Sequence, residues 1–384
     1  MPDAPASPFP RWPLAALATS FFVLGVSVLS VIALAAPITA DLEIESQQIA
    51  YLITLFALTY AVAAPSVQIV FRRVPLKRLI LAGLVLIALG AAIGASAPGF
   101  WLLAVSRLIM GFGASMVGPI SLAIGSGMVA PGQQGRGLAA VFSGMTLSSV
   151  AGMPLSAWLG AEVGWREATL LLGGLALLAA LAIWRLVPQQ EARDGPTAAQ
   201  LFAILRQPRI MSAVLVTFLQ MASQFATYAL VGPFLAAEFD TAIALLPLAL
   251  LIFGVGGNAV GGWLADRFRA DRVCLAVLSA SCLFFLLMAV APADQTLGLL
   301  LVGCWAVLGL MFQAPQQRRL IGLAPARAGL ILALHASSLY VGMSFGSSLS
   351  GWVAAHSGFG ALPLASLLLA GLGVLATAYA SRRA

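Results

Sequence analysis

The chain carries little charge for its length. Only 9% of its 384 residues are Asp, Glu, Lys or Arg, whereas 61% are hydrophobic. Soluble domains have about 25% charged and about 45–50% apolar residues, and a soluble fold could not cover its surface with so few charged groups. This composition excludes a soluble globular protein and indicates an integral membrane protein.

Residues that bind metals or perform covalent chemistry are also scarce. The three cysteines and two histidines form no CxxC motif and no Cys/His cluster. No nucleophile is paired with a base, and no glycine-rich phosphate loop with a lysine follows a strand. We therefore expect no metal, no cofactor, no enzyme activity and no ATP-driven transport, and we interpret Cys274, Cys282 and Cys304 as small packing residues.

The sequence is dominated by long apolar runs. A helix needs about 20 apolar residues to cross a bilayer, and runs of about that length fill nearly the whole chain. They predict an all-α membrane protein with twelve transmembrane helices and no sizeable soluble domain. The predicted spans are 12–37, 46–70, 79–97, 100–128, 138–162, 167–187, 209–237, 243–265, 273–291, 296–313, 329–353 and 361–380.

The basic residues lie almost entirely on one side of these spans. The pI is near 10.0, which by itself could suggest nucleic-acid binding. With the N-terminus inside, however, every Lys and Arg falls in a cytoplasmic segment except Arg107, inside a span, and Arg166, in an outer loop. This is the positive-inside bias. It predicts a multi-pass protein of the inner membrane with both termini in the cytoplasm and no nucleic-acid partner.

Two charged segments indicate an internal repeat. QIVFRRVPLKR (68–78) and GGWLADRFRADR (261–272) follow the second and eighth spans, with Arg72 in the first where Asp266 stands in the second. We expect two pseudo-symmetric six-helix bundles, 1–187 and 209–384. The cytoplasmic linker 188–208 between them would carry a short amphipathic helix at 199–206. Transporters built from such parallel repeats bind substrate near the bilayer midplane between the repeats.

Further echoes support the duplication. Gly152-Met153-Pro154 in the fifth span is repeated as Gly342-Met343-Ser344 in the eleventh, and Gly164-Trp165 is repeated as Gly358-Phe359.

The motifs together resemble the major facilitator superfamily. More narrowly they resemble its twelve-span drug:proton antiporter branch, close to the arabinose-efflux-permease-like members. Gly262, Asp266 and Arg267 match the G-x-L-A-D-R loop signature, and Arg72 replaces the acid in the first copy. Arg107 begins an R-x-x-x-G pattern in the fourth span. The fifth span is similar to the antiporter signature of this branch through Gly144, Gly152, Pro154 and Gly160.

The resemblance implies the major facilitator fold and gating roles for these motifs. Asp266 and Arg267 would form a latch with basic residues or a helix N-terminus at the inner surface. Because Arg72 replaces the acid, the first copy of the latch would be weakened. The alternative is that Arg72 serves only as one of the cytoplasmic charges that set the orientation of the protein in the membrane. Gly152 allows close helix approach and Pro154 kinks the helix, roles that packing alone also explains.

Six residues are candidates for contact with substrate or for coupling. Arg107 is the one charge well inside a span, which is by default a functional-site hypothesis; the alternative is a structural Arg bonded to carbonyls of the first or fifth span. Polar groups of the seventh span should face a cavity or a neighbouring helix. Asn258 could equally serve helix packing, and His335 could titrate near neutral pH or be structural. The candidates are Arg107, Gln220, Gln224, Tyr228, Asn258 and His335.

Acidic residues are missing from the interior of the predicted spans. Many relatives in the resembled branch carry an acid in the first span for proton coupling, but this chain has none there, and Asp41 at the outer end is the nearest substitute. We predict a monomeric secondary transporter that exports a small polar or amphiphilic molecule by alternating access, with protons as the favoured coupling partner. The alternatives are an uncoupled or gradient-driven facilitator and a non-transporting membrane sensor or scaffold.

Overall fold

The structure is a computed structural model that describes residues 10–130, 134–189, 198–240, 257, 260–261, 263–264, 267–323 and 328–382. These residues are helical apart from short turns. The helices are α1 (Arg11–Ala33), α2 (Ala35–Leu42), α3 (Ser46–Val70), α4 (Leu76–Ala95), α5 (Phe100–Gly127), α6 (Gln134–Leu147), the π-helix η1 (Ser148–Gly152), α7 (Met153–Glu162), α8 (Trp165–Leu186), α9 (Ala198–Leu205), α10 (Pro208–Tyr228), α11 (Val231–Phe239), α13 (Ala270–Val290), α14 (Gln295–Met311), α15 (Gln313–Leu323), α16 (Ala328–Ser357), the 3₁₀-helix η4 (Phe359–Ala361) and α17 (Leu362–Arg382).

The helices account for the predicted spans. Ten helical stretches in the described part of the chain are long and apolar enough to cross a membrane, and they match the predicted spans other than the eighth and eleventh. The eleventh is α16, a helix of 30 residues. The eighth, 243–265, lies largely outside the described residues. The all-α membrane fold is confirmed, and the described helices are consistent with twelve spans.

The chain forms two compact units. The first comprises Met1–Ser30 and Ser66–Gly195, and the second comprises Val31–Pro65 and Pro196–Ala384. One boundary falls inside the predicted linker, and the short helix expected there is present as α9. The second unit also takes in α2 and most of α3. The bundle boundaries 1–187 and 209–384 stay a prediction.

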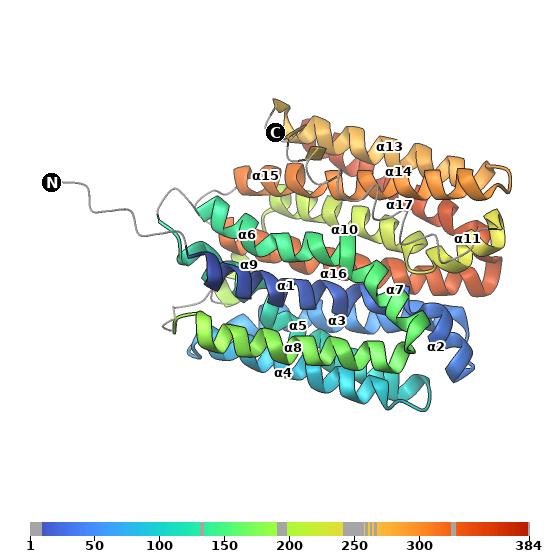
Figure 1. The fold of residues 1–384 in the computed structure, drawn as a ribbon. Coiled ribbons are helices and arrows are strands. Elements are labelled where there is room, and N and C mark those ends of the chain that lie inside the picture. The colour runs from blue at the N-terminus through green and yellow to red at the C-terminus, as the bar shows by residue number, and fades with distance from the viewer. Residues whose placement is uncertain are drawn as a thin grey trace. The chain divides into compact units, whose positions relative to one another are not determined.

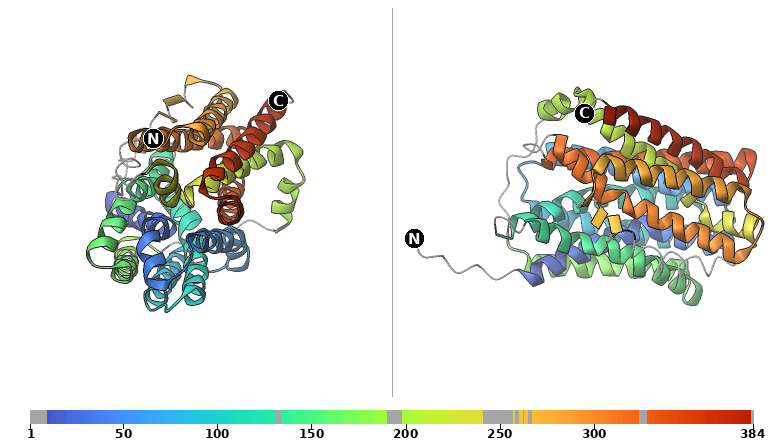
Figure 2. Two further views of the ribbon diagram at one scale, coloured as in Figure 1. Left: turned by 90° about the vertical axis from the view of Figure 1, so that its right-hand side faces the viewer. Right: turned by 90° about the horizontal axis from the view of Figure 1, so that it is seen from above.

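Close helix packing holds each unit together. In the first unit α4 packs against both α5 and α8 (Figure 1). In the second unit α10 packs against α16 and α17, and α17 also packs against α13. Within each unit these long helices run roughly along one direction (Figures 1 and 2). Lys77, from the first charged segment, donates hydrogen bonds to the carbonyls of Trp184 and Val187 at the end of α8, where a cation favours the helix dipole.

The first and seventh spans are each broken near one end, which corrects their predicted extents of 12–37 and 209–237. α1 ends at Ala33 and α2 follows, while α10 ends at Tyr228 and α11 follows. Proline causes both breaks, because its ring clashes with the carbonyl four residues earlier. Pro37 stands four residues after Ala33, and Pro233 stands four after Ala229, the C-cap of α10. The break is thus repeated in the two halves of the sequence.

The backbone turns that follow the two broken spans occur in both halves of the sequence. The turns that follow the fifth and eleventh spans are repeated in the same way. Among the described residues, positive φ occurs at Glu43 (51°), Asp240 (50°), Gly164 (103°) and Gly358 (79°). Glu43 caps α2 and Asp240 caps α11 in the left-handed conformation. Gly164 and Gly358 follow the fifth and eleventh spans, as the sequence echo suggested. Left-handed turns are rare for residues other than glycine, so their pairing supports a structural duplication.

Glycines of the fifth and eleventh spans make equivalent close contacts. A Cβ added to Gly144 would collide with the carbonyl oxygen of Ala18 in α1, and one added to Gly346 would collide with that of Ala222 in α10. The first span therefore packs on the fifth as the seventh packs on the eleventh. Small residues allow such close backbone approach in membrane helices.

The fifth span bends through a wide turn. The π-helix η1 separates α6 from α7, and Pro154 is the second residue after it. A π-turn is a known cause of helix kinks and relieves the contact between a proline ring and the preceding turn. A Cβ on Gly152 would meet the side chain of Val26 in α1. These observations support the packing roles of Gly152 and Pro154.

The tenth span extends beyond its predicted end at residue 313. After a break at Phe312, α15 continues to Leu323. The polar sequence QAPQQRRLIGL resembles a loop, but its buried polar groups find partners inside the second unit, as described below. The prediction ended this span too early because sequence alone does not show those partners.

Alanine at a close-contact glycine should destabilise the fold. We expect Gly144→Ala and Gly346→Ala to cost about 1–3 kcal/mol through overpacking. Gly174→Ala and Gly371→Ala are matched controls, because an added Cβ meets nothing within 4 Å at either position. The controls should keep or raise the unfolding temperature, since alanine favours helix over glycine. Thermal unfolding in detergent measures this, and equal shifts for all four variants would contradict the packing interpretation.

Candidate functional site

Arg107 lies in the first third of α5 and is buried in the first unit, with 3% of its surface exposed. Its Nη1 donates to the carbonyl oxygen of Ser27 at 2.7 Å, and its Nη2 lies 3.5 Å from that of Val28. Both acceptors belong to α1. The structure therefore shows the bonding to the first span that the sequence left open as an alternative. Arg107 ties α5 to α1, and a role toward substrate stays a prediction.

The polar residues of α10 are buried in the second unit. Thr217, Gln220 and Gln224 are at most 8% exposed, as expected for one helix face. Thr227 Oγ1 and Ser366 Oγ lie 2.7 Å apart, so Thr227 pairs with α17. Tyr228 instead packs against Trp305 of α14, with ring centroids 5.9 Å apart.

This polar face of α10 is directed at α14 and α15. Gln316 Nε2 donates to Thr217 Oγ1 at 3.0 Å. A Cβ built on Gly309 would lie 2.9 Å from Gln224 Nε2. Along α10 the contacts are made in the order Thr217, Gln224 and Tyr228. Their partners on the other span stand in the reverse order: Gln316, Gly309 and Trp305. The two spans are therefore antiparallel, and their polar groups lie between them.

Gln316 is the centre of a buried hydrogen-bond network. Its Nε2 also donates to the carbonyl oxygen of Ala213 at 2.7 Å, and its Oε1 accepts a weak bond from Cys274 Sγ at 3.6 Å. Thr217 Oγ1 lies 3.2 Å from His335 Nδ1. Because Thr217 accepts from the amide, its own proton is available for Nδ1, which favours the neutral imidazole tautomer with its proton on Nε2.

Several buried polar atoms make no hydrogen bond to any described residue. In the second unit they are both amide atoms of Gln220, Nε2 of Gln224, Nε1 of Trp305, Nε2 of His335, Nη1 of Arg319 and Oγ of Ser350. Burying such a group without a partner costs about 1–3 kcal/mol, and each case calls for an explanation. These residues belong to α10, α14, α15 and α16. This concentration makes the interior of the second unit the best-supported candidate site.

An ion pair lies at one end of this network. Arg319 Nε in α15 is 2.9 Å from Asp271 Oδ1 in the first turn of α13, and the Arg319 side chain is only 8% exposed. Arg269 Nη2 lies 3.8 Å from the other carboxylate oxygen. The pair joins the charged loop segment to the tenth span. In the sequence Arg319 is one of many cytoplasmic charges, and no local pattern indicates this ion pair.

The predicted gating residues are only partly described. Arg72 is exposed in the turn after α3. Arg267 is exposed and lies 5.1 Å from the centroid of the Trp263 ring, a cation–π contact. Asn258, Gly262 and Asp266 fall outside the described residues. The latch therefore stays a prediction.

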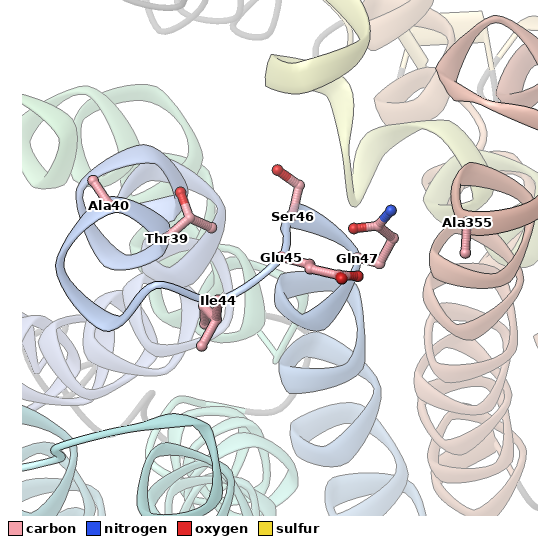
Figure 3. A pocket seen from close by; sticks show the side chains of 7 residues that line it. All are labelled: Thr39, Ala40, Ile44, Glu45, Ser46, Gln47 and Ala355. Carbon is pink, nitrogen blue, oxygen red and sulfur yellow. The ribbon is translucent and has the colours of Figure 1, made fainter.

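An open cavity of about 660 Å³ lies elsewhere in the second unit, where α2 leads into α3. Its lining is Thr39, Ala40, Ile44, Glu45, Ser46, Gln47 and Ala355. Figure 3 shows the Glu45 and Gln47 side chains close together at the start of α3, with Ala355 on α16 beyond them. None of the predicted substrate residues lines this cavity.

The model of the Major Facilitator Superfamily matches residues 15–313. The chain belongs to the major facilitator superfamily. It is a transporter and not an enzyme, in agreement with the expectation from sequence.

Full-length relatives support this assignment. The "Inner membrane transport protein YdhP" of Escherichia coli is 24% identical over 377 residues, covering 97% of each chain. A "Probable sugar efflux transporter" of Helicobacter pylori is 25% identical over 345 residues, covering 89% of this chain and 88% of that one.

Solved structures share the major facilitator fold. A bacterial homologue of the human lysosomal transporter Spinster, in an inward-facing and unoccupied conformation, matches with a TM-score of 0.80 at 15% identity over 98% of both chains. The human organic anion transporter MFSD10 matches with a TM-score of 0.69 at 16% identity, covering 96% of this chain and 99% of that one.

Sequence reasoning missed Gln316 and Trp305 in this facilitator. Gln316 lies just past the predicted end of its span, and Trp305 was one aromatic among many apolar residues. A signal was present for Gln316, because it stands three residues before Arg319 on one helix face. No comparable signal marks Trp305, whose importance follows from its position opposite α10.

Replacing Gln316 should destabilise the protein. We expect Gln316→Met, which keeps the side-chain volume, to cost about 1–3 kcal/mol because it leaves Thr217 and the Ala213 carbonyl without their donor. Gln317→Met, at the half-buried neighbouring position, is the control and should change stability little. Thermal unfolding of both purified variants decides the matter; an unchanged transition for Gln316→Met would mean that the network contributes no stability.

Proposed function

We propose that this facilitator exports a small polar or amphiphilic molecule across the inner membrane by alternating access, with proton antiport as its energy source. One observation carries the substrate part: both amide atoms of Gln220 and Nε2 of Gln224 are buried on α10 without hydrogen-bond partners among the described residues. A membrane helix would not keep such groups for packing alone. A polar substrate that passes through the protein supplies the missing partners.

Export and localisation rest on the relatives and on charge. The descriptions of relatives as an inner membrane transport protein and as probable sugar efflux transporters support outward movement of a polar cargo in the inner membrane. The basic residues at one end of the spans support cytoplasmic termini. The bilayer is the protein's environment, and the protein works as a monomer.

Proton coupling needs a titratable carrier. The described acids lie at helix ends or in turns, so none can carry a proton through the middle of a span. His335 is the buried candidate, since imidazole is the side chain that titrates near neutral pH and its Nε2 lacks a described partner. The absence of an acid inside the first span favours the alternative, an uncoupled or gradient-driven facilitator.

Transport in inverted membrane vesicles tests the function. Arabinose, uridine and chloramphenicol, each radiolabelled, should be offered with and without an imposed pH gradient. We expect at least one to accumulate faster with the wild-type protein than in vesicles lacking it. Arg107→Ala should lower the rate at least about tenfold, the effect of roughly 1.4 kcal/mol, through loss of its bonds to α1. Arg185→Ala, at the exposed end of α8, is the control. Wild-type export by Arg107→Ala would remove Arg107 from the site.

The coupling assignment is tested in the same vesicles. His335→Asn should abolish the stimulation of transport by the pH gradient, because asparagine cannot bind the proton. His356→Asn is a matched control on the same helix, where the imidazole is exposed and stacked on Trp352. If gradient stimulation is intact in His335→Asn, His335 is not the carrier. If even the wild-type protein shows no stimulation, the uncoupled alternative holds.

A further inference from the structure

We propose that Gln220, Gln224 and Trp305 form a binding subsite between α10 and α14 for an uncharged molecule that presents hydroxyl or amide groups beside a ring or apolar face. The inference rests on the proposed function, since the ligand would be the transported molecule. It adds Trp305, which sequence motifs did not indicate, and it defines the chemistry of the ligand.

The geometry brings the three residues to one interface. Gln224 extends over Gly309 of α14, where an added Cβ would lie 2.9 Å from its Nε2. One helical turn from Gly309 stands Trp305, and one turn from Gln224 stands Tyr228, whose ring centroid is 5.9 Å from that of Trp305. Gln220 lies one turn from Gln224 in the other direction and so shares its face. Glycine at 309 leaves room for the Gln224 amide between the helices.

The unsatisfied hydrogen-bonding capacity at this interface is specific. Gln220 offers an NH₂ group and a carbonyl oxygen, Gln224 an NH₂ group and Trp305 an indole N–H, all buried and without described partners. Gln316, farther along the same helix–helix interface, has all its polar atoms bonded. The fold therefore supplies hydrogen-bond partners for an amide that serves packing alone, as at Gln316. A ligand that both accepts and donates hydrogen bonds would supply partners for the unbonded atoms of Gln220, Gln224 and Trp305.

Charge and aromatic surface define the rest of the ligand. α14 contains no charged residue, and α10 contains only Arg209, in its first turn. A charged ligand would therefore lack a counter-ion on these helices. The rings of Tyr228, Trp305 and Phe285 form a continuous cluster, with Phe285 centred 5.7 Å from Trp305. Aromatic rings of this kind pack against flat or apolar faces.

Binding to the purified full-length protein in detergent tests the subsite. Calorimetric titrations should use arabinose, uridine and chloramphenicol as uncharged probes, and tetraphenylphosphonium and benzoate as charged ones. We expect at least one uncharged probe to bind and neither charged probe to compete. The three uncharged probes show whether the ligand is a sugar, a nucleoside or an amphiphilic amide.

Variants then locate the binding. Trp305→Phe keeps an aromatic ring but removes the N–H, and it should weaken binding at least about fivefold; Gln220→Met should weaken it at least about tenfold. Trp352→Phe, at an exposed position on α16, should stay within about twofold of wild type. Stability provides a second measurement: Gln220→Met should keep or raise the unfolding temperature, because it removes an unpaired polar group, whereas Gln316→Met lowers it.

Three results would overturn the subsite. They are binding of charged probes only, no binding of any uncharged probe, and unchanged affinity in both Trp305→Phe and Gln220→Met. Vesicle transport separates these results from a failure of the proposed function. Export that continues at wild-type rates in both variants leaves the function intact and removes the subsite. Binding that depends on Trp305 in a protein that exports none of the probes keeps the subsite and rejects export.

Discussion

Hydrocarbon offers no hydrogen bonds, and this constraint governs the structure. Backbone and side-chain polar groups inside the bilayer can find partners only in the protein or in molecules that the protein encloses. Helices satisfy the backbone. Polar side chains that remain inside are tied to neighbouring helices, as Arg107 is to the carbonyls of α1 and Gln316 is to Thr217 and Ala213. The described acidic groups lie at helix ends and in turns.

The same constraint explains how the duplicated halves diverged. The features that shape the helices are shared: the proline breaks after the first and seventh spans, the left-handed caps Glu43 and Asp240, and the close glycines Gly144 and Gly346. The polar interiors differ. The first unit holds a buried guanidinium, whereas the second holds a chain of amides, a hydroxyl and an imidazole. Backbone geometry was conserved between the repeats, and the internal chemistry was not.

A protein that satisfied all its polar groups internally would have nothing to offer a passing substrate. In the second unit the bonded and unbonded amides stand side by side, with Gln316 in a network and Gln220 without described partners. Unpaired polar atoms reduce stability, so they are expected where function requires them. In the second unit they occur on α10, α14, α15 and α16.

The sequence alone was enough to predict the membrane class, the helical spans, the internal repeat and most of the polar candidates, because composition, run length and charge placement are local properties that the bilayer translates directly into structure. The sequence also showed that Gly358 repeats Gly164, and both glycines have a positive φ in the structure. Tertiary structure decided which partner each polar group meets: Arg107 with α1, the α10 face with α14 and α15, and Arg319 with Asp271. Those pairings depend on the packing of helices distant in sequence, and no local pattern specifies that packing.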